Sequence, residues 1–245
     1  MRQGRRLLFA LLLLVVLAAT SGEAYPSQIQ ERGKALAWTV GGIVIATFPE
    51  SMKGELNDLS RRFDSHYKKG FPLSALRIEG KGDRWHLSLA GQLLLPLTAQ
   101  ACRFHRSKGK TLAAQWLSNL MEALMRLSPV PHDRPTLGGK TQTEGRVSWY
   151  GGNGWQGRRM ASGETFDDRQ LTAASVDLPF GTLVRLSHPR TGKKVVVRIC
   201  DRFKGHKGRL LDISLGAAEA LGIRRQGVTR LDVEVLGLAS RVGGS

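Results

Sequence analysis

The chain has 245 residues, a formal net charge of +17 and a hydrophobic content of 41%. The length predicts one or two domains, and the apolar content is enough for a packed core. A charge this large indicates an anionic partner, namely nucleic acid, a membrane surface or an acidic wall polymer. The two cysteines and six histidines show no metal-ligand spacing, so we expect no metal and no other cofactor.

The first 24 residues have the composition of a secretory signal peptide. A basic start precedes an almost wholly apolar run over residues 7–20, which is shorter than the roughly 20 residues that a membrane-spanning helix needs. Gly22 and Ala24 supply small residues for cleavage before Tyr25, and an uncleaved membrane anchor is the alternative. No cysteine follows the run, so we expect export to the periplasm or cell envelope without lipoprotein processing. Export excludes nucleic acid as the expected partner.

Residues 36–127 have the pattern of a small α+β domain, and the polar residues 25–34 before them are expected to lack regular structure. Apolar alternation predicts strands, and apolar residues spaced three and four apart predict helices. Strands are expected over residues 36–48, 76–79, 85–90 and 93–98, and helices over residues 53–69 and 111–127. No motif here has a known chemistry, and His66, His86 and His105 are expected to be surface or capping residues. Contacts with envelope or division proteins are one candidate role for this domain.

A segment rich in proline and glycine, residues 128–144, is expected to link this domain to a second one over residues 145–237. Short apolar strands separated by close turns fill the second domain. They are expected over residues 147–150, 183–187, 194–200, 210–213 and 230–236. Ser214 and Gly222 are expected to begin and end one short helix between the last two strands. Many short strands with one helix predict a mainly β fold with a closed or nearly closed barrel.

Cys102 and Cys200 fall in the two different predicted domains. An exported chain meets an oxidising compartment, in which the two cysteines could form a disulfide. Cys200 also lies in an apolar strand, where a buried free thiol is common. The sequence leaves both alternatives open.

A series of motifs recurs in a characteristic order across the second domain. They are Ser148-Trp149-Tyr150-Gly151, Ala161-Ser162-Gly163-Glu164 with Phe166-Asp167, Leu171-Thr172-Ala173-Ala174, Leu178-Pro179-Phe180-Gly181-Thr182, Val195-Val196-Val197-Arg198 with Asp201-Arg202, and Gly208-Arg209 with Asp212-Ile213-Ser214. Their order and spacing resemble the RlpA-like (rare lipoprotein A) family of double-psi β-barrels. The resemblance implies a six-stranded barrel that acts on peptidoglycan glycan strands as a septal-ring-type lytic transglycosylase and leaves 1,6-anhydro ends. It does not extend to residues 36–127.

The chemistry that this resemblance implies needs one well-placed carboxyl group. That group protonates the glycosidic oxygen and then accepts the proton of the sugar's 6-hydroxyl as the anhydro ring closes, so no nucleophilic water is required. Asp201, in the family's Asp-Arg pair at a strand end, is the candidate acid and base, and Glu164 is the candidate second carboxyl group. The alternative for Asp201 is a structural carboxylate that satisfies backbone amides.

Further residues in the motifs are candidate substrate ligands. They are Arg202 for a glycan carboxylate, Asp167, Thr172 and Ser175 for sugar hydroxyls, and Trp149 and Tyr150 for stacking on a sugar face. Barrel packing is the alternative for both aromatic residues, and Asp212 is expected in a turn or capping role.

The chain departs from the family pattern beside these residues. Ser175 stands where the family has a histidine, and Phe203-Lys204-Gly205 replaces the usual Gly-Pro after the Asp-Arg pair. Serine without a partner is a weak base, and His188 and His206 are expected to be surface residues. The alternative function is therefore an expansin-like module that binds glycan without cleaving it. A secreted barrel that binds another protein is a third hypothesis.

Overall fold

The computed structural model describes residues 25–128, 134–152, 154–205, 208–239 and 241–244. The predicted signal peptide, residues 1–24, lies outside the described residues, as does His206. Within the described part of the chain, no helix combines the length and the apolar content needed to cross a membrane.

Three antiparallel strands open the fold: β1 (Ser27–Arg32), β2 (Ala35–Val40) and β3 (Ile43–Pro49). The expectation that residues 25–34 lack regular structure is wrong, because β1 pairs with β2 along its whole length. After a short 3-10 turn (Glu50–Met52), helix α1 (Lys53–Lys69) packs against this sheet. Its Asp64 carboxylate accepts a hydrogen bond from the Ser27 N–H at 3.2 Å. This contact joins distant residues, so a local sequence pattern does not reveal it.

A second antiparallel sheet follows, and it later meets the barrel. Its strands are β5 (Leu76–Lys81), β6 (Arg84–Leu89) and β7 (Gln92–Leu97), preceded by β4 (Phe71–Pro72) and a 3-10 turn (Leu73–Ala75). Two helices complete this half of the chain: α2 (Ala99–Phe104) and α3 (Gly109–Leu127). The Thr98 side chain caps α2 by accepting the Ala101 N–H at 3.1 Å. The predicted strands and helices between residues 36 and 127 are confirmed with ends shifted by a few residues, except that the strand expected over residues 36–48 is the pair β2 and β3. Helix α2 was not predicted.

The remaining strands close into a six-stranded barrel in the order β10-β11-β9-β12-β8-β13. Their bounds are β8 (Gln142–Tyr150), β9 (Thr172–Ala174), β10 (Thr182–Ser187), β11 (Lys194–Asp201), β12 (Arg209–Ser214) and β13 (Val228–Leu238). Two parallel pairs, β11 with β9 and β12 with β8, are set among antiparallel ones. Helix α4 (Leu215–Leu221) begins at the Ser214 cap and ends at Gly222 in the left-handed region, as predicted. The closed barrel confirms the predicted fold class, although β8 begins inside the segment predicted as a linker.

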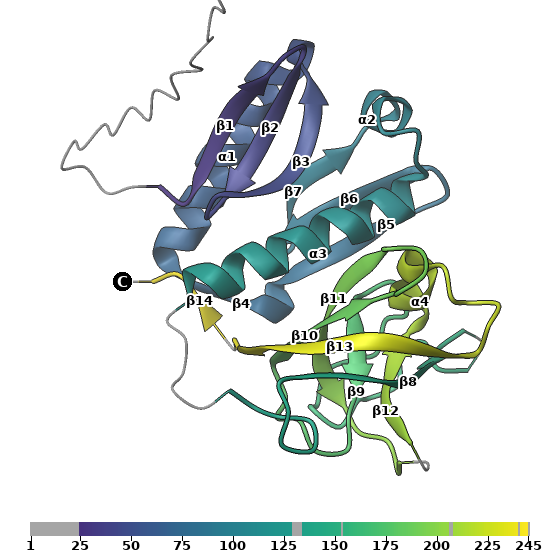
Figure 1. Cartoon of the computed structure of the whole chain (residues 1–245). Helices are drawn as coiled ribbons and strands as arrows, with labels where there is room; N and C mark the ends of the chain where they lie inside the picture. Colours follow the sequence, from purple (N-terminus) through teal and green to yellow (C-terminus); the bar gives the residue numbers. More distant parts are fainter. Residues whose placement is uncertain (1–24, 129–133, 153, 206–207, 240, 245) are drawn as a thin grey trace, which may run out of the picture.

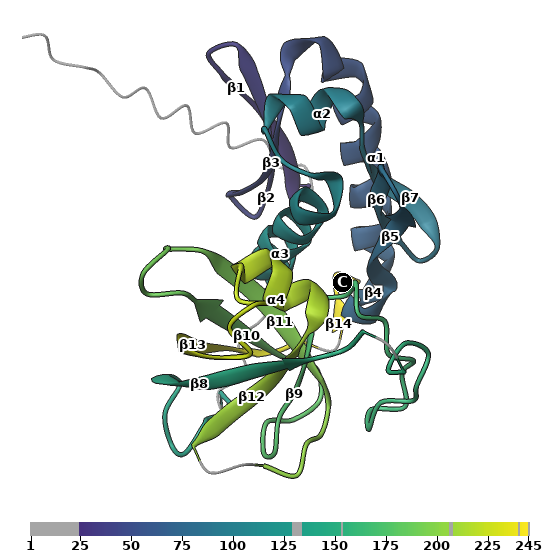
Figure 2. The same cartoon turned by 90° about the vertical axis from the view of Figure 1, so that its right-hand side faces the viewer.

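Helix α3 covers the part of strand β11 that has a neighbouring barrel strand on one side only. Strand β9 is only three residues long, and its pairing with β11 begins at Arg198, so the upstream half of that edge of β11 has no neighbouring strand. Unpaired backbone groups at such an edge need other partners. Helix α3 lies between the first two sheets and the barrel and packs along β11 (Figures 1 and 2). The Ser118 hydroxyl accepts the buried Val196 N–H at 2.8 Å, which a longer β9 would otherwise bind.

The helix is buried on two sides. Leu117, Met121 and Met125 recur every four residues, and Met125 contacts Gly237 of β13. Away from this stripe, Trp116 packs against Phe48 of β3 with ring centroids 5.1 Å apart. One continuous core of buried apolar side chains therefore runs from the first sheet through α3 into the barrel.

A buried glutamine joins the second sheet to the barrel. The Gln170 side chain donates to the Ile78 carbonyl at 2.8 Å and accepts the Ile78 N–H at 2.9 Å, so it pairs with both backbone groups of one residue in β5. At the other end of the chain, β14 (Arg241–Val242) pairs with β4. The barrel is thus attached to the first half of the chain at several separate points.

The two cysteines are free thiols, so the disulfide alternative is wrong. Cys200 is buried with Met160 and Phe166 in a small apolar cluster apart from the main core. Burial raises the pKa of its thiol to about 12, which keeps the group neutral near pH 7.

We expect Gln170→Leu to lower the free energy of unfolding by about 2–4 kcal/mol, because it leaves the N–H and C=O of Ile78 buried without partners. Urea denaturation followed by circular dichroism measures this loss. Gln142→Leu, at an exposed position, is the matched control and should change stability by less than about 0.5 kcal/mol. Equal effects of the two substitutions would show that the Gln170 contact does not hold the two halves together.

Candidate functional site

Asp201 is the last residue of β11, and three polar contacts orient its carboxyl group. Oδ1 accepts hydrogen bonds from the N–H of Ala161 at 2.9 Å and from the N–H of Arg202 at 2.8 Å. Oδ2 lies 3.4 Å from the hydroxyl of Tyr150. The residue is half-buried. One oxygen is therefore fixed by the backbone, while the other has a single long contact and capacity for a further partner.

A tight turn places the Ala161 N–H beside Asp201. The Met160 carbonyl accepts the Gly163 N–H at 2.9 Å, and Gly163 has a φ of 89°, which residues with a Cβ rarely adopt. The Ser162 N–H donates to the Cys200 carbonyl at 3.0 Å. The turn is thus bonded to the end of β11, which explains why the Ala-Ser-Gly-Glu motif and the Asp-Arg motif belong to one site.

Tyr150 joins Asp201 to a group of aromatic rings. Burial raises the pKa of Tyr150 above its usual value, and the nearby Asp201 carboxylate adds to this effect, so the phenol keeps its proton and donates toward Asp201. The Tyr150 ring lies 4.9 Å from that of Phe166 and 5.4 Å from that of Trp155. Trp155 is 41% exposed, which is unusual for so large an apolar side chain.

Arg202, the residue after Asp201, packs on the ring of Phe180. The Arg202 guanidinium lies 3.9 Å from the centre of the Phe180 ring, and its Nη1 donates to the backbone carbonyls of Asp201 and Ser175. Phe180 is 38% exposed. We use the term Asp201 surface for Asp201, Tyr150, Trp155, Phe180 and Arg202.

Three other predicted ligands have side chains that are buried or bonded away from the Asp201 surface. Ser175 is buried, and its hydroxyl accepts a backbone N–H three residues further on at 3.2 Å. The indole N–H of Trp149 donates to the Arg224 carbonyl at 3.1 Å, and its ring packs on the main core. Thr172 is buried, and its hydroxyl has no hydrogen-bond partner within the described ranges. Among described residues, no hydrogen bond joins these three side chains to the Asp201 surface.

Glu164 forms a two-pronged ion pair with Arg198 of β11, with both N–O distances at 2.7 Å. The hydrogen bonds from Arg198 lower the pKa of Glu164, and burial opposes this effect without reversing it. Glu164 is therefore ionised at neutral pH. Its ion pair fixes the loop that carries Ala161 onto β11.

Asp167 lies where the barrel meets the second sheet. Its carboxylate accepts hydrogen bonds from Arg169 at 2.8 and 2.9 Å, from Arg77 at 3.0 Å and from Gln170 at 3.0 Å. Burial alone would raise the pKa of Asp167, but the hydrogen bonds from Arg169 and Gln170 outweigh it and lower the pKa to about 2. The residue thus acts as an anchor between β5 and the barrel.

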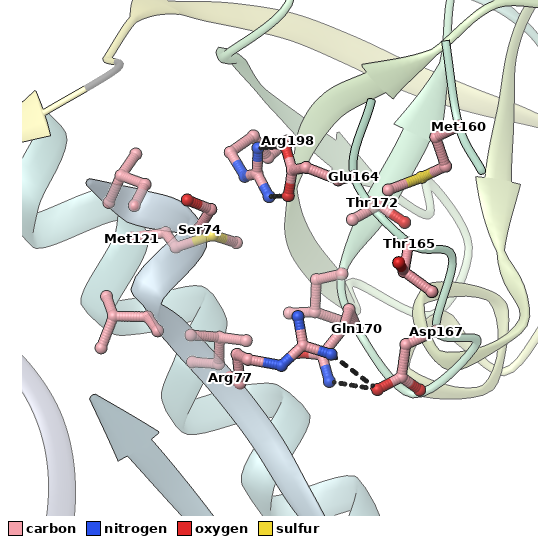
Figure 3. Close-up of a pocket in the computed structure, with 14 residues that line it drawn as sticks. Ser74, Arg77, Met121, Met160, Glu164, Thr165, Asp167, Gln170, Thr172 and Arg198 are labelled. Atoms are coloured by element: carbon pink, nitrogen blue, oxygen red, sulfur yellow. Dashed lines mark hydrogen bonds and ion pairs between the residues drawn. The ribbon is translucent and has the colours of Figure 1, made fainter. Parts of the chain in front are cut away.

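Glu164, Asp167 and Thr172 border a pocket between the barrel and the first half of the chain. Figure 3 shows the ion pair of Glu164 with Arg198 and that of Asp167 with Arg77 at different sides of this pocket. Its volume is about 20 Å³, close to the space that one water molecule needs. A sugar ring does not fit. The structure therefore places Asp201, Tyr150 and Arg202 on the Asp201 surface and Glu164, Asp167 and Thr172 around this pocket, while Ser175 and Trp149 belong to neither group.

The expectation that His188 is a surface residue is wrong, because its side chain is buried in the turn between β10 and β11. This turn lies at the opposite end of β11 from Asp201, about 20 Å away at the usual rise per strand residue. His188 therefore cannot replace the missing histidine. Among described residues, no three His, Cys, Asp or Glu side chains gather as a group that could hold a metal ion.

Sequence reasoning missed Trp155 and Arg198 as site residues. Trp155 lies in a glycine-rich turn segment with no apolar pattern. A tryptophan outside every predicted strand and helix is a signal that could have identified it. Arg198 belongs to a recognised motif, but its partner Glu164 is far away in the sequence, and a buried ion pair of this kind leaves no local signal.

Residues 142–233 match the family model described as lytic transglycolase. The chain is 48% identical over 95 residues to a Nostoc protein named "Probable endolytic peptidoglycan transglycosylase RlpA", with 38% of this chain and 26% of the relative covered. It is 42% identical over 94 residues to a Neisseria meningitidis protein named "Endolytic peptidoglycan transglycosylase RlpA", with 38% of each covered. The match thus spans well under half of these relatives' lengths.

A solved structure of an apo expansin from Clavibacter michiganensis is 25% identical to the chain. The alignment covers 38% of this chain and 50% of the expansin, with a TM-score of 0.32.

Asp167 should make the stability of the protein depend on pH. The pKa of Asp167 in the folded state is depressed from 3.8 to about 2. Its ionised form therefore contributes fully to the free energy of unfolding above about pH 5, and this contribution is lost as the pH falls toward 2. The shift corresponds to about 2 kcal/mol. We expect Asp167→Asn to be less stable than the wild type at pH 7. The difference between their free energies of unfolding should narrow by about 2 kcal/mol between pH 5 and pH 2 in urea titrations.

Asp232→Asn, at an exposed position, is the control and should show a small gap at every pH. A gap for Asp167→Asn that stays constant over this range would contradict the anchoring role.

Proposed function

Because residues 142–233 form an RlpA-like double-psi β-barrel, we propose that the chain is a peptidoglycan lytic transglycosylase of the cell envelope. It cleaves glycan strands on the Asp201 surface and leaves 1,6-anhydro ends. The observation that carries this proposal is the Asp201 carboxyl group, which is fixed through one oxygen, has capacity at the other and lies beside accessible aromatic rings.

The geometry suits one carboxyl group that acts first as an acid and then as a base. The reaction begins with the neutral carboxyl group and with the glycan bound over the Asp201 surface. Oδ2 gives its proton to the glycosidic oxygen as the bond from that oxygen to C1 breaks. Oδ2 of Asp201 then takes the proton of the sugar's 6-hydroxyl as O6 bonds to C1. The carboxyl group is thereby protonated again, as it was at the start. The Tyr150 hydroxyl can stabilise the carboxylate between the two steps.

The exposed groups beside Asp201 are suited to hold the glycan. Trp155 contacts the Arg158 guanidinium, 5.2 Å from the ring centre, and the rings of Tyr150 and Phe166. The exposed part of its ring, 41%, can contact a sugar. Arg202 is exposed and can pair with a carboxylate on the glycan. We assign Glu164 a positioning role, because Arg198 keeps it ionised and it holds the loop that orients Asp201. The predicted sugar contacts of Asp167, Thr172, Ser175 and Trp149 stay predictions without a step in this mechanism.

The second candidate function is a glycan-binding module without catalysis. It is favoured by Ser175, which stands at the family's histidine position and whose hydroxyl is already bound to the backbone. In this case the Asp201 surface would grip glycan through the same aromatic and arginine side chains.

We expect residues 25–245 to release anhydro-ended fragments from bare glycan strands, as detected by mass spectrometry. Asp201→Asn should lower the rate by at least about 100-fold, a typical loss for an acid–base group. It should still sediment with glycan, because an asparagine oxygen can accept the same two backbone N–H groups. Trp155→Ala should weaken sedimentation.

Asp177→Asn, an exposed carboxylate on the neighbouring loop, is the control and should keep full activity. Sedimentation without any anhydro product from the wild type would support the binding module and refute the enzyme. Unchanged activity of Asp201→Asn would remove Asp201 from the mechanism.

A further inference from the structure

The first half of the chain contains two copies of one structural unit. In the first copy, strands β1, β2 and β3 are followed by α1, and in the second, β5, β6 and β7 are followed by α2 and α3. Ser27 lies opposite Val40 in the first sheet, and Leu76 lies opposite Leu89 in the second, so both members of the pair are shifted by 49 positions. The same shift relates the pairs of β2 and β3 to those of β6 and β7. The two sheets are therefore equivalent residue by residue.

The two units also exchange equivalent contacts. Each third strand has one extra residue at a bulge, Ile45 in β3 and Leu94 in β7, and these residues are again 49 positions apart. Asn119 of α3 donates to the Ile45 carbonyl at 3.0 Å. In the same way, Arg62 of α1 donates to the Leu94 carbonyl at 3.2 Å. Each helix thus caps the third strand of the other unit, so Asn119 and Arg62 occupy equivalent positions.

The second unit has an additional helix, α2, which packs on β3. His105 caps the end of this helix, and its Nε2 donates to the Thr47 carbonyl of β3 at 2.7 Å, because a carbonyl oxygen can only accept. The imidazole ring is also nearly perpendicular to the Trp116 ring of α3, with ring centres 5.7 Å apart. One aromatic ring with a donor therefore fills the corner between β3 and α3.

The equivalent corner, between β7 and α1, is open. In the first unit only a 3-10 turn separates β3 from α1, so nothing within the described residues 25–128 corresponds to α2. Leu59 of α1 and Trp116 of α3 each stand three residues before the capping residue of their helix, so the smaller leucine replaces the tryptophan. A groove of about 200 Å³ lies in this corner, and its apolar lining includes Met52, Leu56, Leu59, Leu93 and Leu95.

The groove is suited to an aromatic ring that carries a donor. Pro96 lines it and is the equivalent of Thr47, so the Pro96 carbonyl is directed away from β6, and no described residue takes the place of His105 there. A proline is tolerated in an edge strand when its nitrogen faces away from the sheet, which agrees with this orientation. An apolar cavity of about 150 Å³ is enough to bind benzene, so one ring fits the groove. Leu93 is 49% exposed and offers apolar surface for a partner to cover.

We propose that this groove is a docking site for a partner protein, which inserts one aromatic side chain with an N–H or O–H donor from a short helical segment. The chain itself supplies the pattern for this occupant, since His105 at the end of α2 makes the equivalent contacts at β3. The ring lies against Leu59, and its donor reaches the Pro96 carbonyl. Glu55 at the groove favours a basic residue beside the ring. The inference concerns the first half of the chain and does not depend on the proposed function.

The probe is a peptide with the sequence of residues 98–108, which contains α2 and His105, with Cys102→Ser to prevent oxidation. It is titrated into residues 25–245 with labelled leucine methyl groups, and the NMR shifts locate the bound peptide. We expect saturable shifts of Leu59, Leu93 and Leu95 with a Kd of about 1 mM, because so short a helix has to form on binding. The same peptide with His105→Ala should bind at least about tenfold more weakly, since it lacks both the ring and the donor.

Leu93→Asp is the groove variant, and Val228→Asp, at a similarly exposed apolar residue of the barrel, is the matched control. Leu59→Trp is a second variant, which fills the groove with the residue found in the equivalent corner. Thermal unfolding checks that all three variants are folded. We expect both groove variants to weaken peptide binding at least about tenfold, and the control to bind the peptide as the wild type does.

Three results of the titration would overturn the proposal. They are the absence of saturable shifts at the groove, shifts that concentrate elsewhere on the protein, and peptide binding that Leu93→Asp leaves unchanged. Sedimentation velocity over a range of protein concentrations tests for another occupant. A dimer that Leu93→Asp dissociates and Val228→Asp retains would show that a second copy of the chain fills the groove, and would also overturn the proposal.

Discussion

The shortness of strand β9, three residues, leaves part of β11 unpaired, and the packing of the two halves of the chain depends on this. Because β9 pairs with β11 only from Arg198 onward, half of one edge of β11 is left without a strand. Helix α3 covers that edge, and Ser118 supplies the acceptor that the missing strand would have supplied. The helix also buries Leu117, Met121 and Met125, each worth about 1.5–3 kcal/mol. The first half of the chain therefore completes the barrel.

The loop after β8 links this architecture to chemistry. Its turn donates the Ala161 N–H to Asp201, its Glu164 is bound to β11, and its Phe166 packs on Tyr150. The next residue, Asp167, is bonded to Arg77 of the second sheet. One short segment thus joins the Asp201 surface to the second sheet. A displacement of the second sheet would therefore move the loop that orients Asp201.

Much of the fold could be predicted from the sequence, because apolar periodicity and turn residues are local signals. The helix around Leu117 and five of the six barrel strands are confirmed for this reason. Strand β9 (Thr172–Ala174) was missed, because three residues are too few to show an apolar period. Strand β1 was missed since its polar residues are held by pairing with β2 and by Asp64, both long-range contacts. At the site, Asp201, Tyr150 and Arg202 lie together as the motifs indicated. The burial of Glu164, Asp167 and Thr172 around a separate pocket could not be predicted, since it depends on how the two halves of the chain pack.

The barrel depends on the first half of the chain to cover the edge of β11. Urea unfolding of residues 25–245 beside the excised barrel, residues 134–245, tests this dependence most directly. The indole NMR signals of Trp149 and Trp155, resolved from those of Trp38, Trp85 and Trp116, report on the barrel in both. We expect one cooperative transition in the longer chain and a clearly lower midpoint for the excised barrel, since the β11 edge and the face under α3 become exposed. An excised barrel with the same midpoint and slope as in the longer chain would contradict it.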